Sequence, residues 1–443
     1  MLLIYSIKDS PRLQYITKIL FGVILEIEYS IVIVSEKFDI PKSESNENAV
    51  LFYGMSMPAM ISIPNEGLLF EDNIRRHEIV LEKSDFYKLR FSSMKSGDYA
   101  IDFDLFSSAF YLLTQYEYYH SLSFDLHGRY DEKSSIFYKD ALHSEPLVDI
   151  YANFLFEKLK LKYPGIQRKK RQFNYKISFD IDSPYLYENK GFILTAGSLI
   201  KNILKLKMGA LVKQIQTLRG GKDPYDVYDY IIDKVPNDNL IFFFLINRKS
   251  PHDGRHTFQN KAYRNLIKKI ADTGIETGIH PSYKSFMDAD LIRFEKAELE
   301  SITGKPVISS RMHFLKYRLP ETFHNIERSG IKSDYTLCPI HDTGFKTFIS
   351  MPYTWFDLVQ NVETDLTLYP TMVMDRSLQQ YMHLTPEKAI MEIKKMIDIT
   401  FEFNGLFTIL FHNNSLSEKA EWKGWKMVFE ETMMYLSDKK TIN

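Results

Sequence analysis

Two aspartates separated by one residue close an apolar run, and their spacing suits hydrolytic chemistry. Asp180 and Asp182 follow the run at 175–179. If that run is a β-strand, side chains two residues apart lie on the same face. A bound cation keeps one such carboxylate ionised as its ligand, while the other stays free to accept a proton. Aspartate also begins turns after strands, so the interpretation depends on partners elsewhere in the chain.

Histidines and an arginine occur at the ends of later apolar runs. His280 ends the run at 276–280, Arg311 and His313 end the run at 307–313, and His412 ends the run at 406–412. A neutral imidazole binds a divalent metal or moves a proton, and otherwise it bonds to nearby backbone. An arginine beside acids orients a catalytic carboxylate or forms a structural ion pair. Barrel enzymes carry their chemistry at the C-terminal ends of strands, so this placement favours one shared site.

Other residues have a chemical and a structural interpretation. Leu410 shares a strand face with His412, so the leucine can line a small apolar pocket while the histidine donates a proton. Trp355 is either a pocket residue that stacks on carbohydrate or part of the core. His252 and His256 have the spacing of a helical metal pair, but an intervening glycine and a preceding proline favour a loop without metal.

The pattern of runs predicts an α/β protein with two domains. Residues 1–163 combine short apolar runs at 31–34, 49–53 and 60–63 with helical patterns at 103–119 and 147–161. A Pro-Gly pair and a basic run indicate a linker at 164–173. In 174–443, helical segments alternate with strand-like runs, which is typical of a parallel sheet. Those runs lie at 175–179, 240–246, 276–280, 307–313, 335–337 and 406–412.

Taken in order, these motifs resemble those of polysaccharide deacetylase-like proteins, a superfamily of the carbohydrate esterase type. The stretches concerned are Phe-Asp-Ile-Asp at 179–182, Gly-Ile-His-Pro-Ser-Tyr at 278–283, Ser-Arg-Met-His-Phe at 310–314 and Leu-Phe-His at 410–412. The stretches at 222–226 and 318–322 resemble a bacterial branch found in surface-polysaccharide gene neighbourhoods, and 125–130 resembles the N-terminal domain of unknown function in that branch. The resemblance spans nearly the whole chain.

The resemblance implies a distorted (β/α) barrel with fewer than eight strands, preceded by a smaller α/β domain. It also implies a divalent metal, Zn²⁺ first and Co²⁺, Ni²⁺ or Mn²⁺ as alternatives, and the removal of N- or O-acetyl groups from an acetylated saccharide. The implied roles are general base for Asp180, metal ligand for Asp182 and His280, proton donor for His412, positioning of the base for Arg311, and substrate binding for Leu410, Trp355 and Tyr283.

One departure from the family pattern concerns the metal. The second histidine of the family follows the first by four positions, and Lys284 occupies that place here. A protonated lysine is a poor ligand, so His313 is expected to replace the missing histidine. The sequence therefore predicts a carbohydrate deacetylase of surface-polysaccharide or glycoconjugate assembly. The alternative is a catalytically attenuated glycan-binding or scaffold protein on the same fold. A barrel phosphoesterase would need further metal ligands.

Composition limits the partners and the compartment. The formal net charge of −1 argues against nucleic acid as the main partner. The lone cysteine, Cys338, and the lack of a signal-peptide pattern at the start lead us to expect a cytoplasmic protein. The segment 192–212 is interrupted by lysines and predicts no membrane span. Its basic, amphipathic pattern favours a lid or a helix packed over the sheet, with contact to a membrane surface as the alternative.

Overall fold

The computed structural model describes residues 1–35, 48–91, 97–121, 123–189, 196–197, 200, 202–204, 206 and 208–442. The chain divides into two compact units, which are described separately. The first comprises 1–172, 344–370 and 403–405, and the second comprises 173–343, 371–402 and 406–443.

The first unit is built on a small parallel sheet. Its strands pair in the order β2-β1-β3-β4, with β1 Leu2–Ser6 in contact with β2 Tyr29–Ile33 and β3 Ala49–Tyr53, and β4 Ile61–Ile63 beyond β3. Every residue of β1 and β3 is buried, which is typical of central strands covered on both faces. The runs at 31–34, 49–53 and 60–63 thus correspond to strands, whereas β1 was not predicted.

Helices and two antiparallel hairpins complete this unit. The hairpins are β5 Ile79–Lys83 with β6 Tyr87–Phe91, and β12 Tyr353–Asp357 with β13 Val362–Leu368. The helices are α1 Pro11–Thr17, α3 Leu105–Leu113, α4 Ile136–Lys139 and α5 Leu147–Lys162, with a π-helical turn at Lys18–Ile24 and 3₁₀ turns at Leu68–Phe70, Tyr116–His120, Glu132–Ser134 and Leu142–Ser144. The Asp104 carboxylate accepts from Ser107 N at 2.9 Å and so caps the start of α3.

Two later segments belong to this first unit. The buried Asp149 of α5 accepts hydrogen bonds from the backbone N–H and the hydroxyl of Ser350, each at 2.9 Å. Arg171, in the predicted linker, donates to the carbonyls of Val23 at 2.8 Å and Phe403 at 3.3 Å. A single domain boundary at 164–173 places these later segments in the second domain instead. Such long-range contacts leave no signal in the order of residues along the chain.

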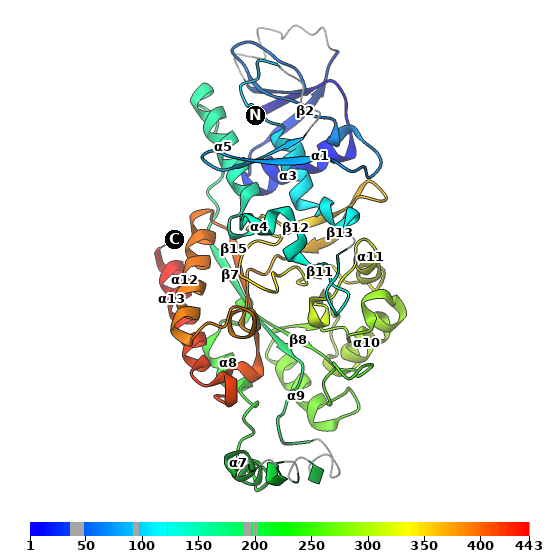
Figure 1. Cartoon of the computed structure of the whole chain (residues 1–443), viewed down its shortest axis with the longest axis vertical. Helices are drawn as coiled ribbons and strands as arrows, with labels where there is room; N and C mark the ends of the chain where they lie inside the picture. The colour runs from blue at the N-terminus through cyan, green and yellow to red at the C-terminus, as the bar shows by residue number, and fades with distance from the viewer. Residues whose placement is uncertain are drawn as a thin grey trace. The chain divides into compact units, whose positions relative to one another are not determined.

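The second unit is built around a larger parallel sheet. Within the described residues, seven of its strands pair in parallel in the order β11-β10-β9-β8-β7-β15-β14. Figure 1 shows β7 and β15 side by side. Their bounds are β7 Asn174–Ile181, β8 Leu240–Phe244, β9 Glu276–Ile279, β10 Ser309–Ser310, β11 Ser333–Asp334, β14 Val373–Met374 and β15 Leu406–His412. The predicted strand at 307–313 is longer than β10, and the predicted strand at 335–337 begins after β11 ends. Strand β14 was not predicted.

The two ends of this sheet approach each other. Thr371 N–H, just before β14, donates to the carbonyl of Leu337, just after β11, at 2.8 Å. Gly278 of β9 has no room for a side chain, because an added Cβ would overlap the Phe243 ring and lie 2.9 Å from the Ser309 carbonyl oxygen. Because the hydrogen bond between Thr371 and Leu337 joins its two ends, the sheet curls into a distorted barrel. The predicted α/β fold class with its smaller N-terminal domain is confirmed.

Helices follow most of the strands. Those of the second unit are α7 Met208–Leu218, α8 Tyr228–Lys234, α9 Lys261–Asp272, α10 Ala289–Thr303, α11 Glu321–Arg328, α12 Pro386–Glu402 and α13 Trp425–Ile442. Short 3₁₀ or π turns lie at Asn237–Asn239, Ser285–Met287, His313–Leu315, Ser377–Tyr381, Asn413–Leu416 and Ala420–Trp422. No helix among the described residues is both long and apolar enough to cross a membrane.

Candidate active site

Five of the predicted site residues meet at the C-terminal ends of the barrel strands. Asp180 is the penultimate residue of β7 and Asp182 follows that strand, His280 follows β9, His313 begins the 3₁₀ turn after β10, and His412 is the last residue of β15. The Nε2 atom of His412 lies 3.7 Å from Asp182 Oδ2, and that of His280 lies 3.6 Å from Asp180 Oδ2. Segments up to 232 residues apart in the chain thus share one site.

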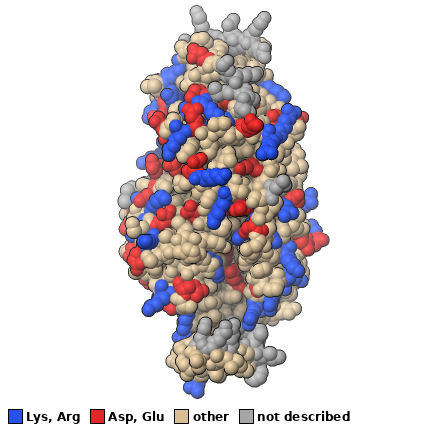
Figure 2. Space-filling view, in the orientation of Figure 1, with Lys and Arg blue, Asp and Glu red and all other residues tan. Residues whose placement is uncertain are grey.

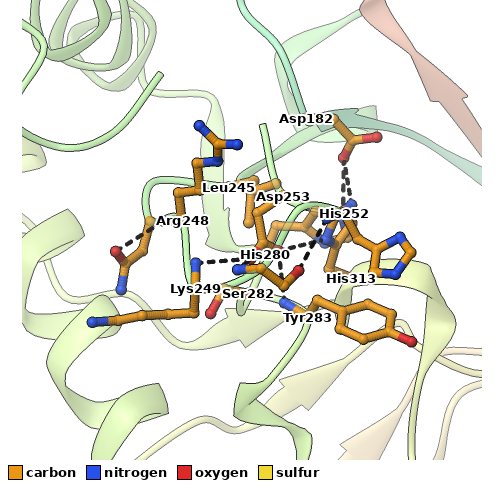
Figure 3. A network of polar contacts seen from close by, with 12 residues as sticks. Asp182, Leu245, Arg248, Lys249, His252, Asp253, His280, Ser282, Tyr283 and His313 are labelled. Carbon is orange, nitrogen blue, oxygen red and sulfur yellow. Dashed lines mark hydrogen bonds and ion pairs between the residues drawn. The ribbon is translucent and has the colours of Figure 1, made fainter. Parts of the chain in front are cut away.

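Three of these side chains form a group suited to a divalent cation. Asp182 Oδ1 lies 3.4 Å from His280 Nε2 and 3.6 Å from His313 Nε2 (Figure 3). All three potential ligand atoms lie within 4.8 Å of one another. Within the described part of the chain, Asp182 Oδ1 is buried and accepts no hydrogen bond. A buried carboxylate oxygen costs free energy unless it is paired, so a cation facing two imidazoles fits the residues present.

The hydrogen bonds of the two imidazoles leave their Nε2 atoms available as ligands. His280 Nδ1 lies 2.5 Å from the Arg311 carbonyl oxygen, which can only accept a proton. His313 Nδ1 lies 3.1 Å from Asp253 Oδ1. Each ring therefore carries its proton on Nδ1 and presents the Nε2 lone pair toward Asp182, as metal-binding histidines do.

Asp253 anchors His313 and was not predicted. Its Oδ2 accepts from the backbone N–H of Lys249 at 2.9 Å and of Ser250 at 2.7 Å, and its Oδ1 accepts from that of Tyr283 at 2.8 Å (Figure 3). Burial would raise the pKa of Asp253, but the contact with His313 and these backbone donors lower it to about 2. The carboxylate is therefore ionised and ties the loops after β8 and β9 to one ligand.

Asp180 lies beside this group and is held by an arginine. Arg311 donates from one guanidinium nitrogen to Asp180 Oδ1 and to Ser178 Oγ, both at 2.9 Å. Its remaining nitrogens donate to the Tyr335 carbonyl at 3.0 Å and to Thr371 Oγ1 at 3.1 Å. The guanidinium is fully buried inside the barrel, so it holds Asp180 Oδ1 and leaves Oδ2 directed toward His280.

On the other side of Asp182, His412 pairs with a second acid that was not predicted. Asp375 lies just after β14, and its Oδ1 is 2.8 Å from His412 Nδ1 while its Oδ2 accepts the His412 backbone N–H at 2.7 Å. Burial would raise the pKa of Asp375, but the facing imidazole lowers it. The ionised carboxylate orients the ring through its contact with Nδ1.

The imidazoles around Asp182 affect its protonation. Burial would raise the pKa of Asp182, but the imidazoles of His313, His280 and His412 together hold it well below its usual range. Asp182 is therefore an anion at neutral pH, as a metal ligand must be.

The remaining predicted residues differ in their relation to this site. Leu410 of β15 is buried in an apolar cluster with Leu315, Cys338, Ile340 and Met374. Tyr283 is half-buried and its ring lies 4.4 Å from that of His252, centre to centre. Trp355 is buried in β12 of the first unit, so its substrate-binding role stays a prediction.

The departures from the family pattern are explained by the same geometry. Lys284 is exposed, and His313 instead joins Asp182 and His280 as a potential ligand. His252 and His256 lie in a loop, as predicted, and His256 Nε2 is 3.1 Å from the Glu188 carbonyl. The acids at 253 and 375 end no long apolar run, so no signal in the sequence distinguished them from surface aspartates.

Comparisons with known proteins give a family for part of the chain and a set of similar folds. Residues 2–164 match the model of a family of unknown function, DUF7033. No curated protein matches the chain.

Among solved structures, the chain is similar to several deacetylases. A protein from Mycobacterium smegmatis assigned as a polysaccharide deacetylase is 18% identical, with a TM-score of 0.37 over 60% of this chain and 85% of that one. The polysaccharide deacetylase Bc1974 from Bacillus cereus is 11% identical, with a TM-score of 0.28 over 60% and 89%. The carbohydrate deacetylase Agd3 is 8% identical, with a TM-score of 0.37 over 100% and 84%. These similarities concern the fold alone.

Proposed function

We propose that this protein is a metal-dependent hydrolase that removes N- or O-acetyl groups from a carbohydrate during surface-polysaccharide or glycoconjugate assembly. The observation that carries the proposal is the convergence of Asp182, His280 and His313 on one point, with Asp180 on one side and His412 on the other. Two nitrogen ligands and one carboxylate leave an open position for water or substrate, which is the arrangement of catalytic zinc sites. Zn²⁺ is therefore the cation we propose.

The residues around the metal position have complementary tasks. A cation held by Asp182, His280 and His313 would act as a Lewis acid that acidifies water and polarises the acetyl carbonyl. Asp180 would accept the proton of the attacking water, because Arg311 occupies its Oδ1 and leaves Oδ2 free to do so.

The second proton transfer falls to His412. The Asp375 carboxylate holds the His412 ring at Nδ1, so Nε2 faces the Asp182 side of the site and would deliver its proton there. Transfer of that proton to the departing nitrogen or oxygen breaks the bond to the acetyl group. Acetate and a free sugar amine or hydroxyl are the products, and the apolar cluster containing Leu410 would receive the acetyl methyl.

Acetate release tests this proposal directly. Purified protein is loaded with Zn²⁺ or Co²⁺, its metal content is measured by elemental analysis, and it is incubated with N-acetylated and O-acetylated oligosaccharides. We expect acetate from the native protein, none from His280→Ala or Asp180→Asn, and unchanged release from the exposed-site control Lys284→Ala. A metal-loaded protein that releases no acetate from any of these sugars would contradict the proposal. Glycan affinity that survives Asp180→Asn without any turnover would instead support the scaffold alternative.

A further inference from the structure

The connection between β7 and α8 has an unusual charge composition. Between Glu188 and Asp223 the sequence contains no acidic residue. The same stretch contains seven basic residues, which are Lys190, Lys201, Lys205, Lys207, Lys213, Arg219 and Lys222. In a chain of net charge −1, this stretch forms a local excess of positive charge.

Helix α7 within this connection has its apolar side turned outward. Met208, Val212, Ile215 and Leu218 recur at helical spacing and are 60%, 49%, 36% and 46% exposed. On the opposite side, Gln214 and Thr217 are buried. This is the reverse of the usual arrangement, in which a surface helix buries its apolar stripe and exposes its polar face.

A side-chain contact keeps the polar side inward. Asn202 Nδ2 donates to Gln214 Oε1 at 2.8 Å, which joins α7 to the residues that precede it. Those residues extend the outward apolar surface, because Ile203, Leu204 and Leu206 are 54%, 77% and 82% exposed. The apolar surface is therefore larger than one helix stripe.

The predicted packing of this segment over the sheet is wrong for the described residues of α7. The apolar side chains of α7 are not covered by the described residues of the protein. Residues 192–195, 198–199, 201, 205 and 207 of the predicted segment 192–212 lie outside the described residues. In Figure 1, α7 lies at the lower end of the view, and Figure 2 shows uncharged atoms there with lysine and arginine close by.

We propose that α7, together with Ile203, Leu204 and Leu206, docks on the surface of a membrane that contains anionic lipids. An interfacial helix of this kind places aliphatic side chains among the acyl chains while basic side chains contact the lipid phosphates. Arg219, directly after α7, is exposed, and Lys213 on α7 is half-buried, so Arg219 reaches the headgroups directly and Lys213 along its flexible stem.

A second copy of the chain fits this surface less well. A two-fold dimer would bring the same patch of each copy together, and a stretch with seven basic and no acidic residues would repel itself. An anionic bilayer satisfies both the exposed aliphatic side chains and the basic ones. This proposal does not depend on the catalytic activity.

Vesicle co-sedimentation of the full-length protein tests the proposal. The vesicles contain phosphatidylcholine alone or phosphatidylcholine mixed with phosphatidylglycerol. We expect binding to the anionic vesicles, weaker binding to the neutral ones, and a loss of binding as salt is raised. Each basic side chain at an anionic surface strengthens partitioning about fivefold, so the double variant Lys213→Glu, Arg219→Glu should weaken it at least about 25-fold.

The apolar contribution is tested separately with a matched control. The triple variant Val212→Gln, Ile215→Gln, Leu218→Gln should lose binding by about tenfold or more, because each aliphatic side chain would otherwise leave water. Met391→Gln, on α12 and 71% exposed, should bind like the native protein. Circular dichroism should be unchanged in all variants, since the replaced side chains are exposed or, for Lys213, half-buried.

Three outcomes would overturn the proposal. They are no sedimentation with anionic vesicles, equal sedimentation of the native protein and the triple variant, and a native dimer that the triple variant converts to a monomer while neither binds vesicles. The last outcome would assign the surface to self-association.

Discussion

Asp253 supplies no metal ligand in our proposal, yet its replacement by alanine should weaken metal binding. In Asp253→Ala the Nδ1 proton of His313 loses its acceptor, so the ring is free to rotate or to move its proton to Nε2. A proton on Nε2 removes the lone pair that faces Asp182. Metal affinity should therefore fall although all three proposed ligands remain.

The size of the effect follows from the contacts of the carboxylate. Loss of the acceptor behind a metal-binding histidine lowers affinity by about 10- to 100-fold, which is about 1.4 to 2.7 kcal/mol. Asp253 also accepts backbone hydrogen bonds from Lys249, Ser250 and Tyr283. Their loss should reduce the free energy of unfolding by about 3 kcal/mol, at about 1 kcal/mol for each bond.

A second buried acid provides the control. Glu295 of α10 accepts from the backbone N–H of Ser282 at 2.9 Å, from its hydroxyl at 2.6 Å and from Asn247 Nδ2 at 2.9 Å, and no imidazole is among these donors. Glu295→Ala should therefore lose similar stability while keeping its metal affinity.

The assay is a Zn²⁺ titration of each metal-free variant against a competing chelator, with thermal melting measured in parallel. The reasoning is refuted if Asp253→Ala binds Zn²⁺ as tightly as Glu295→Ala does. It is also refuted if His313→Ala retains native affinity, because His313 would then be no ligand.

Three further predictions concern other contacts. Gly254→Ala should lower metal affinity and melting temperature together, because the added Cβ would overlap the backbone carbonyl of Asp182. Such overpacking costs about 1 to 3 kcal/mol of folding free energy. A variant with native metal affinity and melting temperature would show that the loop moves to accommodate the methyl group without cost. Asp375→Asn should lower kcat by about 100-fold or more on sugar substrates, but less on an acetyl ester with a good leaving group, because only the former need a proton from His412; equal losses on both would contradict this role. Burial, followed by the charge of a neighbouring aspartate, raises the pKa of Glu66 from 4.5 to about 7. The folded protein therefore binds this proton more tightly than the unfolded chain, and stability present at pH 4 is lost as pH rises toward 8, by about 3 kcal/mol. The melting temperature of the native protein relative to Glu66→Gln should fall over that range, and a constant difference would exclude this titration.

The fold was predictable where strands are long and continuously apolar. The run at 406–412 coincides with β15, and the run at 240–246 contains all of β8, since strands buried on both faces consist almost wholly of apolar residues. The two-residue strands β10, β11 and β14 are defined by pairing with neighbours, so no local pattern marks their limits.

The candidate site likewise contains residues that were predictable from the sequence and residues that were not. Asp180, Asp182, His280 and His412 stand at strand ends, and parallel strands bring their C-terminal ends to one edge, so their proximity was predictable. His313 was predicted as a metal ligand only because Lys284 occupies the place of the expected histidine. Its distance from Asp182 was not predictable, because spacing along the chain does not measure distance across a barrel. Asp253 and Asp375 were not predicted, since each acts through a contact with a residue at least 37 positions away.

By itself, the amino-acid sequence determined the alternation of strands and helices, the residue types at the strand ends and the basic character of the stretch before Asp223. Only the tertiary structure decided which imidazoles face Asp182, which acids stand behind them and which side of α7 is exposed. The physical reason is that periodicity and charge are local properties of the chain, whereas coordination and exposure depend on neighbours that folding brings from distant positions.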